Sequence, residues 1–225
     1  MKDYIVATIK PWNIAAFRRH APTLEGRWYL ATDAVELAAL LKRLTARYVF
    51  FPHWSSIVPE DILNKAECVC FHMADVPYGR GGSPLQNLIG RGHTDTLLTA
   101  LRMVKELDAG PVYLKRHLSL AGRAQDIFER MADLVYEMIG EIVRTEPKPV
   151  PQQGEVTTFR RRTPEMSILP EHGTVKELYD HIRMLDAETY PLAFLEHGDF
   201  RIEFTGAEIV GDTVRAQVVI ATKPR

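Results

Sequence analysis

A histidine precedes a glycine-rich loop, and an aspartate lies in a second tight turn 36 positions later. His72 ends an apolar segment and leads into this stretch at 73–83, and Asp108 lies in a tight Leu-Asp-Ala-Gly turn. Open α/β sheets carry their sites at such strand ends. Histidine exchanges protons near neutral pH, and a nearby carboxylate orients it and stabilises its charged form. The pattern therefore predicts a proton-transfer pair, with a hydrogen-bonded structural histidine as the alternative.

Two cysteines share the predicted strand that ends at this histidine. Cys68 and Cys70 lie two positions apart, which makes them poor disulfide partners. A zinc site formed by both with His72 is disfavoured, because residues of one strand cannot surround a metal and no second cysteine pair exists. We therefore predict no metal site. Cys70 is interpreted first as a small buried apolar residue, and as a nucleophile only as the less favoured alternative.

Two further segments could bind an anion. The loop Tyr-Gly-Arg-Gly-Gly-Ser at 78–83 could present backbone N–H groups and the Arg80 guanidinium to a phosphate, or it could be a plain turn. The basic run Arg160-Arg161-Arg162 could bind a diphosphate, although such runs are usually solvated surface. Both pairs of alternatives stay open at this point.

Strands and helices alternate in the first 145 residues. Asp33 is placed to cap a helix, with Glu36 able to return a hydrogen bond, and the first helix is expected there. A stripe of apolar residues on a helix at 124–143 indicates a buried face, which is core or a homodimer surface. The expected strands are 4–9, 48–51, 68–72, 97–103 and 112–118, with short helical turns at 61–65 and 84–89. This alternation predicts an α/β fold with a mostly parallel sheet.

A proline-rich segment divides the chain. Its sequence EPKPVPQQGE at 146–155 is typical of a linker. Beyond it, Thr174 and Glu177 form a capping-box pattern before a helix at 175–185, and two strands follow at 200–204 and 214–221. We therefore expect a main domain at 1–145, a linker at 146–173 and a small α+β subdomain at 174–225.

Composition narrows the class of protein. The chain has 225 residues, of which 46% are hydrophobic, with 28 Lys plus Arg against 29 Asp plus Glu and a net charge of −1. These values are typical of a soluble globular protein, and the near-zero charge disfavours binding to duplex nucleic acid. No signal-peptide pattern and no run of 18 apolar residues is present, so the expected location is cytoplasmic, without a membrane partner.

The segment from residue 70 to 110 resembles a known family. Its recurring residues are Cys70-Phe71-His72, Pro77, Arg80-Gly81, Pro84, Gln86, Gly92, Thr96, Thr99 and Leu107-Asp108-Ala109-Gly110. This series resembles the catalytic domain of the folate-dependent formyltransferases, which include methionyl-tRNA formyltransferase and the nucleotide-linked amino-sugar N-formyltransferases. The segment 50–59 resembles the strand and loop that line the family's pterin pocket, and 182–194 resembles the segment after the core in the sugar-modifying branch.

The resemblance implies a fold, a reaction and a set of site residues. The fold would be a three-layer, Rossmann-type formyltransferase core with a mostly parallel sheet and a C-terminal α+β appendage. The reaction would move a formyl group from 10-formyltetrahydrofolate to the primary amine of a small acceptor, with His72 as base and Asp108 as its partner. Phe51, His53, Trp54, Ile57, Val58 and Val104 would bind the donor, and Arg80, Gly81, Gly82, Gln86 and Asn87 the acceptor.

The resemblance leaves several acceptors open. A nucleotide-linked amino sugar is expected first, because methionyl-tRNA would require a basic surface. Methionyl-tRNA and water, the latter giving a formyl hydrolase, are the alternatives within enzymes. A catalytically inactive folate- or nucleotide-binding protein is the alternative outside them.

Two departures from the family pattern matter. Cys70 replaces an asparagine whose amide helps to hold the formyl oxygen, and a thiol is only a weak donor. Loss of one such donor typically costs on the order of 10²- to 10³-fold in rate. Asn87, Gln86 and His53 are the candidate substitutes by motif position. The first strand-to-helix turn also lacks a glycine-rich fingerprint.

Overall fold

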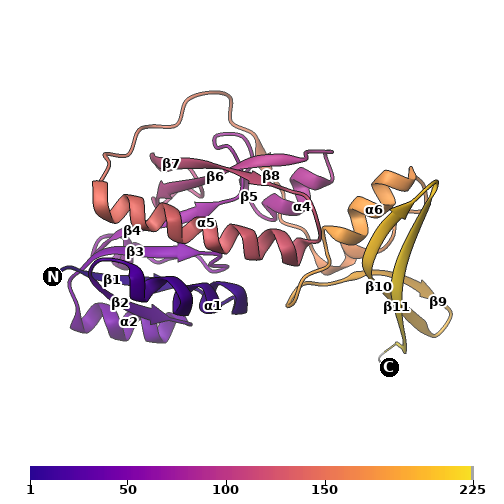
Figure 1. Cartoon of the computed structure of the whole chain (residues 1–225), viewed down its shortest axis with the longest axis horizontal. Coiled ribbons are helices and arrows are strands. Elements are labelled where there is room, and N and C mark those ends of the chain that lie inside the picture. The colour runs from indigo at the N-terminus through magenta and orange to yellow at the C-terminus, as the bar shows by residue number, and fades with distance from the viewer. Residues whose placement is uncertain (224–225) are drawn as a thin grey trace. The chain divides into compact units, whose positions relative to one another are not determined.

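A computed structural model describes residues 1–223 of the chain. Its principal sheet has six strands in the order β2-β1-β3-β4-β6-β7 (Figure 1). The pairs β1–β2, β1–β3 and β3–β4 are parallel, whereas β6 is antiparallel to β4. The strands are β1 (Asp3–Ala7), β2 (Arg27–Ala31), β3 (Ala46–Pro52), β4 (Glu67–His72), β6 (Asp95–Arg102) and β7 (Val112–Ser119). The predicted α/β class with a mostly parallel sheet is confirmed.

Contacts divide the chain into two compact units. The first contains residues 1–81, 97–118 and 128–158, and the second contains 82–96, 119–127 and 159–225. Each unit therefore contains segments that are far apart in the sequence. The three-part division by residue ranges given above stays a prediction.

Alternating side chains of the central strands bury both faces of the sheet in the first unit. Ile5, Val49, Phe51 and Cys68 join one apolar cluster, to which α2 (Ala34–Arg43) and α3 (Glu60–Leu63) contribute. The intervening residues of the same strands are buried as well, among them Val6, Phe50 and Val69. Strands buried on both faces read as continuous apolar runs, which is why the sequence identified β1, β3 and β4.

Helix α5 (Ala124–Thr145) confirms the long predicted helix. Its apolar stripe is buried, from Ile127 to Ile142. Figure 1 shows it crossing the principal sheet. In the first unit it packs on α1 (Pro11–His20), where the Trp12 ring stacks on Phe128 at 5.1 Å.

Two elements of the first unit escaped prediction. Helix α1 begins at Pro11, and β2 is a largely half-exposed strand at the edge of the sheet. Pro11 indicates the end of a strand and equally the first position of a helix, where its missing N–H costs nothing. Asp33 caps α2 as expected through the N–H groups of Val35 and Glu36, whereas the Glu36 carboxylate accepts from Thr32.

The proline-rich segment belongs to the first unit. Val150 and Val112 exchange two backbone hydrogen bonds of 2.8 Å. The carbonyl of Thr157 accepts from the N–H groups of Gly79 and Arg80. The extended chain between these points therefore has fixed ends beside the glycine-rich loop.

The second unit combines a three-stranded antiparallel sheet with helices. The sheet has the order β11-β10-β9, with β9 (Ala193–His197), β10 (Phe200–Val210) and β11 (Thr213–Thr222). Helix α6 (Val175–Arg183) begins with the predicted capping box between Thr174 and Glu177. This unit also contains α4 (Pro84–Ile89) and the 3₁₀ turn η2 (Pro164–Ser167). The first unit further contains the 3₁₀ turn η1 (Ala21–Thr23) and the short strand β5 (Arg80–Gly81), which pairs with β8 (Thr158–Phe159).

Strand β9 is missing from the sequence prediction, and β10 extends well beyond the predicted 200–204. Within the described residues, no helix is long and apolar enough to cross a membrane.

Candidate active site

His72 lies at the carboxyl end of β4 with its ring turned away from solvent. It pairs with Thr99 of β6 and is 7% exposed. Its Nε2 lies 2.7 Å from the carbonyl oxygen of Gly79. Because a carbonyl can only accept, Nε2 must carry a proton and donate it. The neutral ring therefore keeps its lone pair on Nδ1.

Asp108 faces that free nitrogen from the turn between β6 and β7. Its Oδ2 lies 3.5 Å from Nδ1 of His72 and accepts a 2.9 Å hydrogen bond from the N–H of Gly81. Asp108 has a φ of +52°, a left-handed conformation that aspartate tolerates better than most residues. A Cβ on Gly110 would lie 1.7 Å from the carbonyl oxygen of Arg102, so the turn requires glycine there.

The two side chains form an acid–base pair in which one atom, Nδ1 of His72, can accept a proton. Nδ1 of His72 can take up a proton, and the Asp108 carboxylate then stabilises the resulting imidazolium. The separation of 3.5 Å exceeds an ordinary hydrogen bond, and catalytic contacts are often longer before substrate binds. The predicted proximity of the pair is thus realised, with a defined ring tautomer.

Cys70 lies on the same strand face as His72, two residues before it. Burial raises the pKa of its thiol, and the negative charge of Asp108 raises that pKa further. The thiol therefore stays protonated near neutral pH, which disfavours a thiolate nucleophile. A protonated thiol still offers one weak hydrogen-bond donor.

The glycine-rich loop supports the pair through its backbone. Gly79 and Gly81 have φ values of +79° and +108°. The N–H groups of Gly79 and Arg80 donate to Thr157, that of Gly81 donates to Asp108, and that of Gly82 donates to Phe159. All four N–H groups have partners within the protein, so an anion at this loop would need other donors.

The residues predicted to bind the formyl donor fall into two groups. Phe51 and Val58 are buried in the apolar cluster of the first unit, against which Trp54 and Cys70 pack. The Trp54 ring meets Phe51 edge-on at 5.7 Å. Val104 is half-buried, and Ile57 is 92% exposed. Phe51, Val58 and Trp54 therefore form an apolar wall in the cluster against which Cys70 also packs.

His53 belongs to a different group of aromatic rings. Its ring makes edge contacts with Trp12 at 5.3 Å and Phe128 at 4.9 Å. Burial, with a smaller contribution from Lys10, lowers the pKa of His53 to about 3. The ring is therefore neutral at physiological pH.

The predicted acceptor residues are engaged within the protein. In the second unit, Gln86 donates to the carbonyl of Met184, and Asn87 donates to the carbonyls of Gly82, Ser83 and Arg160. In the first unit, Arg80 donates through Nε and Nη2 to Oε1 of Gln152. A role for these residues in binding the acceptor stays a prediction.

Sequence reasoning missed two participants. The carbonyl of Gly79 fixes the tautomer of His72, and Gln152 of the proline-rich segment contacts both the glycine-rich loop and the Asp108 turn. Backbone carbonyls leave no trace in residue spacing. The one sequence feature that pointed to Gln152 was its amide side chain, which lies in a segment whose composition is otherwise typical of a linker.

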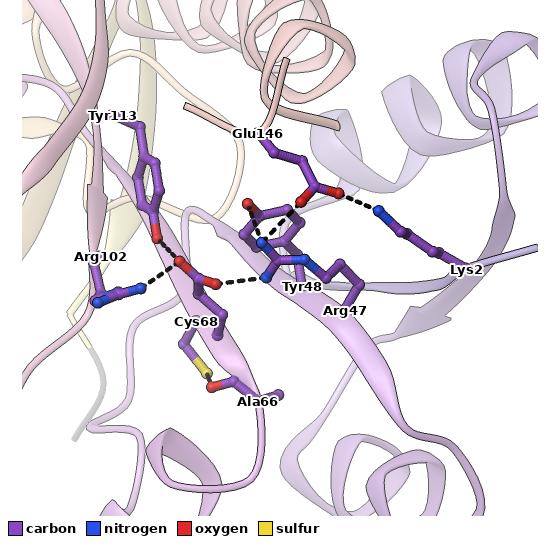
Figure 2. A network of polar contacts seen from close by, with 9 residues as sticks. Lys2, Arg47, Tyr48, Ala66, Cys68, Arg102, Tyr113 and Glu146 are labelled. Atoms are coloured by element: carbon purple, nitrogen blue, oxygen red, sulfur yellow. Dashed lines mark hydrogen bonds and ion pairs between the residues drawn. The ribbon is translucent and has the colours of Figure 1, made fainter. Parts of the chain in front are cut away.

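A second polar cluster lies at the other end of β4 (Figure 2). The Glu67 carboxylate accepts hydrogen bonds from Arg47, Arg102 and Tyr113. Burial alone would raise the pKa of Glu67, but these three hydrogen bonds outweigh it and lower the pKa to about 2. Arg47 also contacts Tyr48 and Glu146, and Glu146 pairs with Lys2. Every charge of the cluster has a partner.

In the part of the chain that the structure describes, no group of three or more His, Cys, Asp or Glu side chains could bind a metal ion.

Comparison with known proteins places this geometry in a family. Residues 164–221 match the family model for the methionyl-tRNA formyltransferase C-terminal domain. A solved structure titled methionyl-tRNA formyltransferase from Clostridium thermocellum is 39% identical, with a TM-score of 0.95 over 99% of this chain and 100% of that chain. The curated methionyl-tRNA formyltransferase of Mesoplasma florum is 27% identical over 173 residues, 73% of this chain and 55% of that protein. The chain thus spans about half the length of the curated relatives it matches.

Two more distant structures share the fold alone. HypX from Aquifex aeolicus, in complex with tetrahydrofolic acid, is 17% identical, with a TM-score of 0.74 over 91% of this chain and 37% of that chain. A sugar N-formyltransferase from a Shewanella species is 15% identical, with a TM-score of 0.69 over 93% of this chain and 99% of that chain. On the strength of the Clostridium thermocellum structure, the chain belongs to the formyltransferase family.

Proposed function

We propose that this protein transfers a formyl group from 10-formyltetrahydrofolate to a primary amine. The observation that carries the proposal is the His72–Asp108 pair, in which Nε2 of His72 is engaged by Gly79 and Nδ1 faces the carboxylate at 3.5 Å. Attack of an amine on a formyl carbon releases a proton, so the site needs a base of this kind. Support for the donor comes from the family pattern and from the tetrahydrofolate complex of HypX.

The chain's own residues account for the proton movements. As the amine nitrogen bonds to the formyl carbon, His72 accepts the amine proton on Nδ1 and Asp108 stabilises the imidazolium. The same proton then passes to the folate nitrogen when its bond to the formyl carbon breaks. The formyl oxygen carries negative charge between these steps and needs a nearby donor, for which the Cys70 thiol and the imidazolium are candidates.

For the acceptor we propose the amino group of methionyl-tRNA. This replaces the nucleotide-linked amino sugar expected first from the sequence, because the methionyl-tRNA formyltransferase structure is far more similar to this chain than the sugar enzyme, at 39% against 15% identity. The earlier expectation relied on net charge, which says nothing about local charge.

An arginine surface in the second unit supports an anionic acceptor. Arg91, Arg160 and Arg161 are exposed, and none of them forms an ion pair within the described residues. Asn87 anchors their segment by donating to the carbonyl of Arg160 at 3.0 Å, and the Arg91 guanidinium lies 4.7 Å from the centre of the Phe159 ring. Arginines whose charge no carboxylate compensates are suited to phosphate groups.

The test is formyl transfer from 10-formyltetrahydrofolate to methionyl-tRNA, run beside nucleotide-linked amino sugars. We expect formylmethionyl-tRNA as the product, and a loss of transfer when Arg160 and Arg161 are both changed to Ala. Arg43→Ala, at an exposed position of α2, serves as the control. Transfer to the sugars but not to methionyl-tRNA would overturn the proposed acceptor. Formate released without any acceptor would indicate a hydrolase.

A binding measurement tests the donor separately. Saturable binding of 5-formyltetrahydrofolate, weakened by Trp54→Ala, is expected because Trp54 is part of the apolar wall beside Cys70. No binding at millimolar ligand would overturn the folate donor and with it the proposed reaction.

A further inference from the structure

We propose that Gln152 is a positioning residue that holds the Asp108 turn against His72, an inference that rests on the proposed formyl transfer. Its Nε2 donates two hydrogen bonds of 2.8 Å, to the carbonyls of Asp108 and Gly110. Its Oε1 accepts from Nη2 of Arg80 at 2.7 Å and from Nε at 3.1 Å. One side chain therefore joins the Asp108 turn to the glycine-rich loop that follows His72.

The chemistry of these contacts selects an amide. Two amide protons match two carbonyls, and one amide oxygen matches the forked guanidinium of Arg80. A glutamate would keep the contact to Arg80 but would present a carboxylate, which cannot donate, to the carbonyls of Asp108 and Gly110. An alanine would leave both carbonyls without their donor, and Gly110 is buried.

What Gln152 holds is the strained part of the site. Asp108 occupies its left-handed conformation with a φ of +52°, which persists only where surrounding contacts enforce it. On the other side, Arg80 stands between Gly79, whose carbonyl fixes His72, and Gly81, whose N–H binds Asp108. Gln152 thus acts on both partners without touching either reacting atom.

Gln152 is itself held in place. Two backbone hydrogen bonds tie Val150 to Val112 of β7, and the Thr157 carbonyl accepts from Gly79 and Arg80. The next residue, Gln153, is exposed and makes no polar contact among the described residues. The chain therefore offers a matched control with the same side chain in the same segment.

The test compares Gln152→Ala with Gln153→Ala in formyl transfer. A misplacement of about 1 Å at a reacting group can cost on the order of 10²-fold. We expect Gln152→Ala to lower kcat by about 10- to 100-fold with little change in KM for either substrate, and Gln153→Ala to match the wild type. Gln152→Glu should not restore the rate, because it cannot donate to the two carbonyls.

A double substitution separates positioning from general stability. If Gln152 acts through Asp108, Gln152→Ala should cost little further rate once Asp108→Asn is present. A wild-type kcat in Gln152→Ala would overturn the inference. So would an equal loss of kcat with and without Asp108→Asn, accompanied by a lowered Tm.

A readout without substrate keeps the inference distinct from the proposed function. Hydrogen exchange at the Gly81 amide, which is bonded to Asp108 at 2.9 Å, should accelerate in Gln152→Ala and not in Gln153→Ala. Equal exchange in the two variants would overturn the positioning role. If the wild type is inactive in formyl transfer but exchange at Gly81 is accelerated in Gln152→Ala, the proposed function is refuted and the positioning role of Gln152 stands.

Discussion

The two ends of β4 hold their acidic groups in opposite ways. At the amino end, the Glu67 carboxylate accepts from two arginines and a tyrosine, and its pKa falls to about 2 (Figure 2). At the carboxyl end, Asp108 accepts one hydrogen bond from Gly81 and faces a histidine at 3.5 Å. A saturated carboxylate has no capacity for chemistry, whereas a partly satisfied one beside a free base does.

The surface hollow near β4 does not coincide with the candidate active site. A surface hollow of about 350 Å³ adjoins the Glu67 end and is lined by residues 63–68, Arg102 and Met103. Its charged groups are all paired, Glu67 with Arg102 and Lys65 with Asp61. The unsatisfied chemistry lies at the other end of the strand, so a surface hollow does not by itself mark the site.

The largest expected effect is at the His72 end. Removal of a general base typically costs about 10²- to 10⁴-fold in rate. We expect His72→Ala and Asp108→Asn each to lower kcat for formyl transfer by about 10³-fold, measured at a temperature where each variant stays folded. His197→Ala and Asp212→Asn, both at exposed positions of the second unit, serve as controls. Activity within tenfold of the wild type in His72→Ala would remove the base from the mechanism.

Glu67→Gln should give the reverse result. The variant removes the carboxylate that pairs with Arg102 and one of the two that pair with Arg47, so we expect a loss of about 2 kcal/mol in the free energy of unfolding. The rate of formyl transfer at a temperature where the protein stays folded should be unchanged. Urea unfolding and steady-state kinetics on the same preparations check both parts. A rate loss without a stability loss would contradict the division between the two ends.

The sequence could predict those parts of this division that short-range patterns encode. Continuous apolar runs identified β3 and β4, and strand ends identified His72 and Asp108, which the fold does bring together. The half-exposed edge strand β2 has no such run, which is why it was missed. Gln152 reaches Asp108 from 44 positions away through backbone carbonyls, and no spacing rule reports such a contact.

The Glu67 cluster also predicts an acid dependence of stability. A carboxyl group whose pKa is lower in the folded protein contributes stability above its unfolded value, and that contribution is lost as pH falls through the folded value. For Glu67 the window runs from about 4.5 down to about 2. Urea unfolding between pH 5 and 3 should show a flatter pH dependence in Glu67→Gln than in the wild type. Parallel curves would mean that the folded and unfolded pKa values of Glu67 are alike.

The smallest expected effect concerns the donor missing from the His72 end. Cys70→Asn introduces an amide beside His72 where the family pattern has asparagine, and an amide donates more strongly than a thiol. We expect kcat to be retained or to rise by up to about tenfold, less than the 10²- to 10³-fold that an oxyanion donor can contribute, because the wild-type thiol and the imidazolium already supply donors. Cys70→Ala is the matched control, since it removes the thiol without adding a donor. A complete loss of transfer in Cys70→Asn, with an unchanged Tm, would mean that the thiol itself takes part, despite the raised pKa that keeps it protonated.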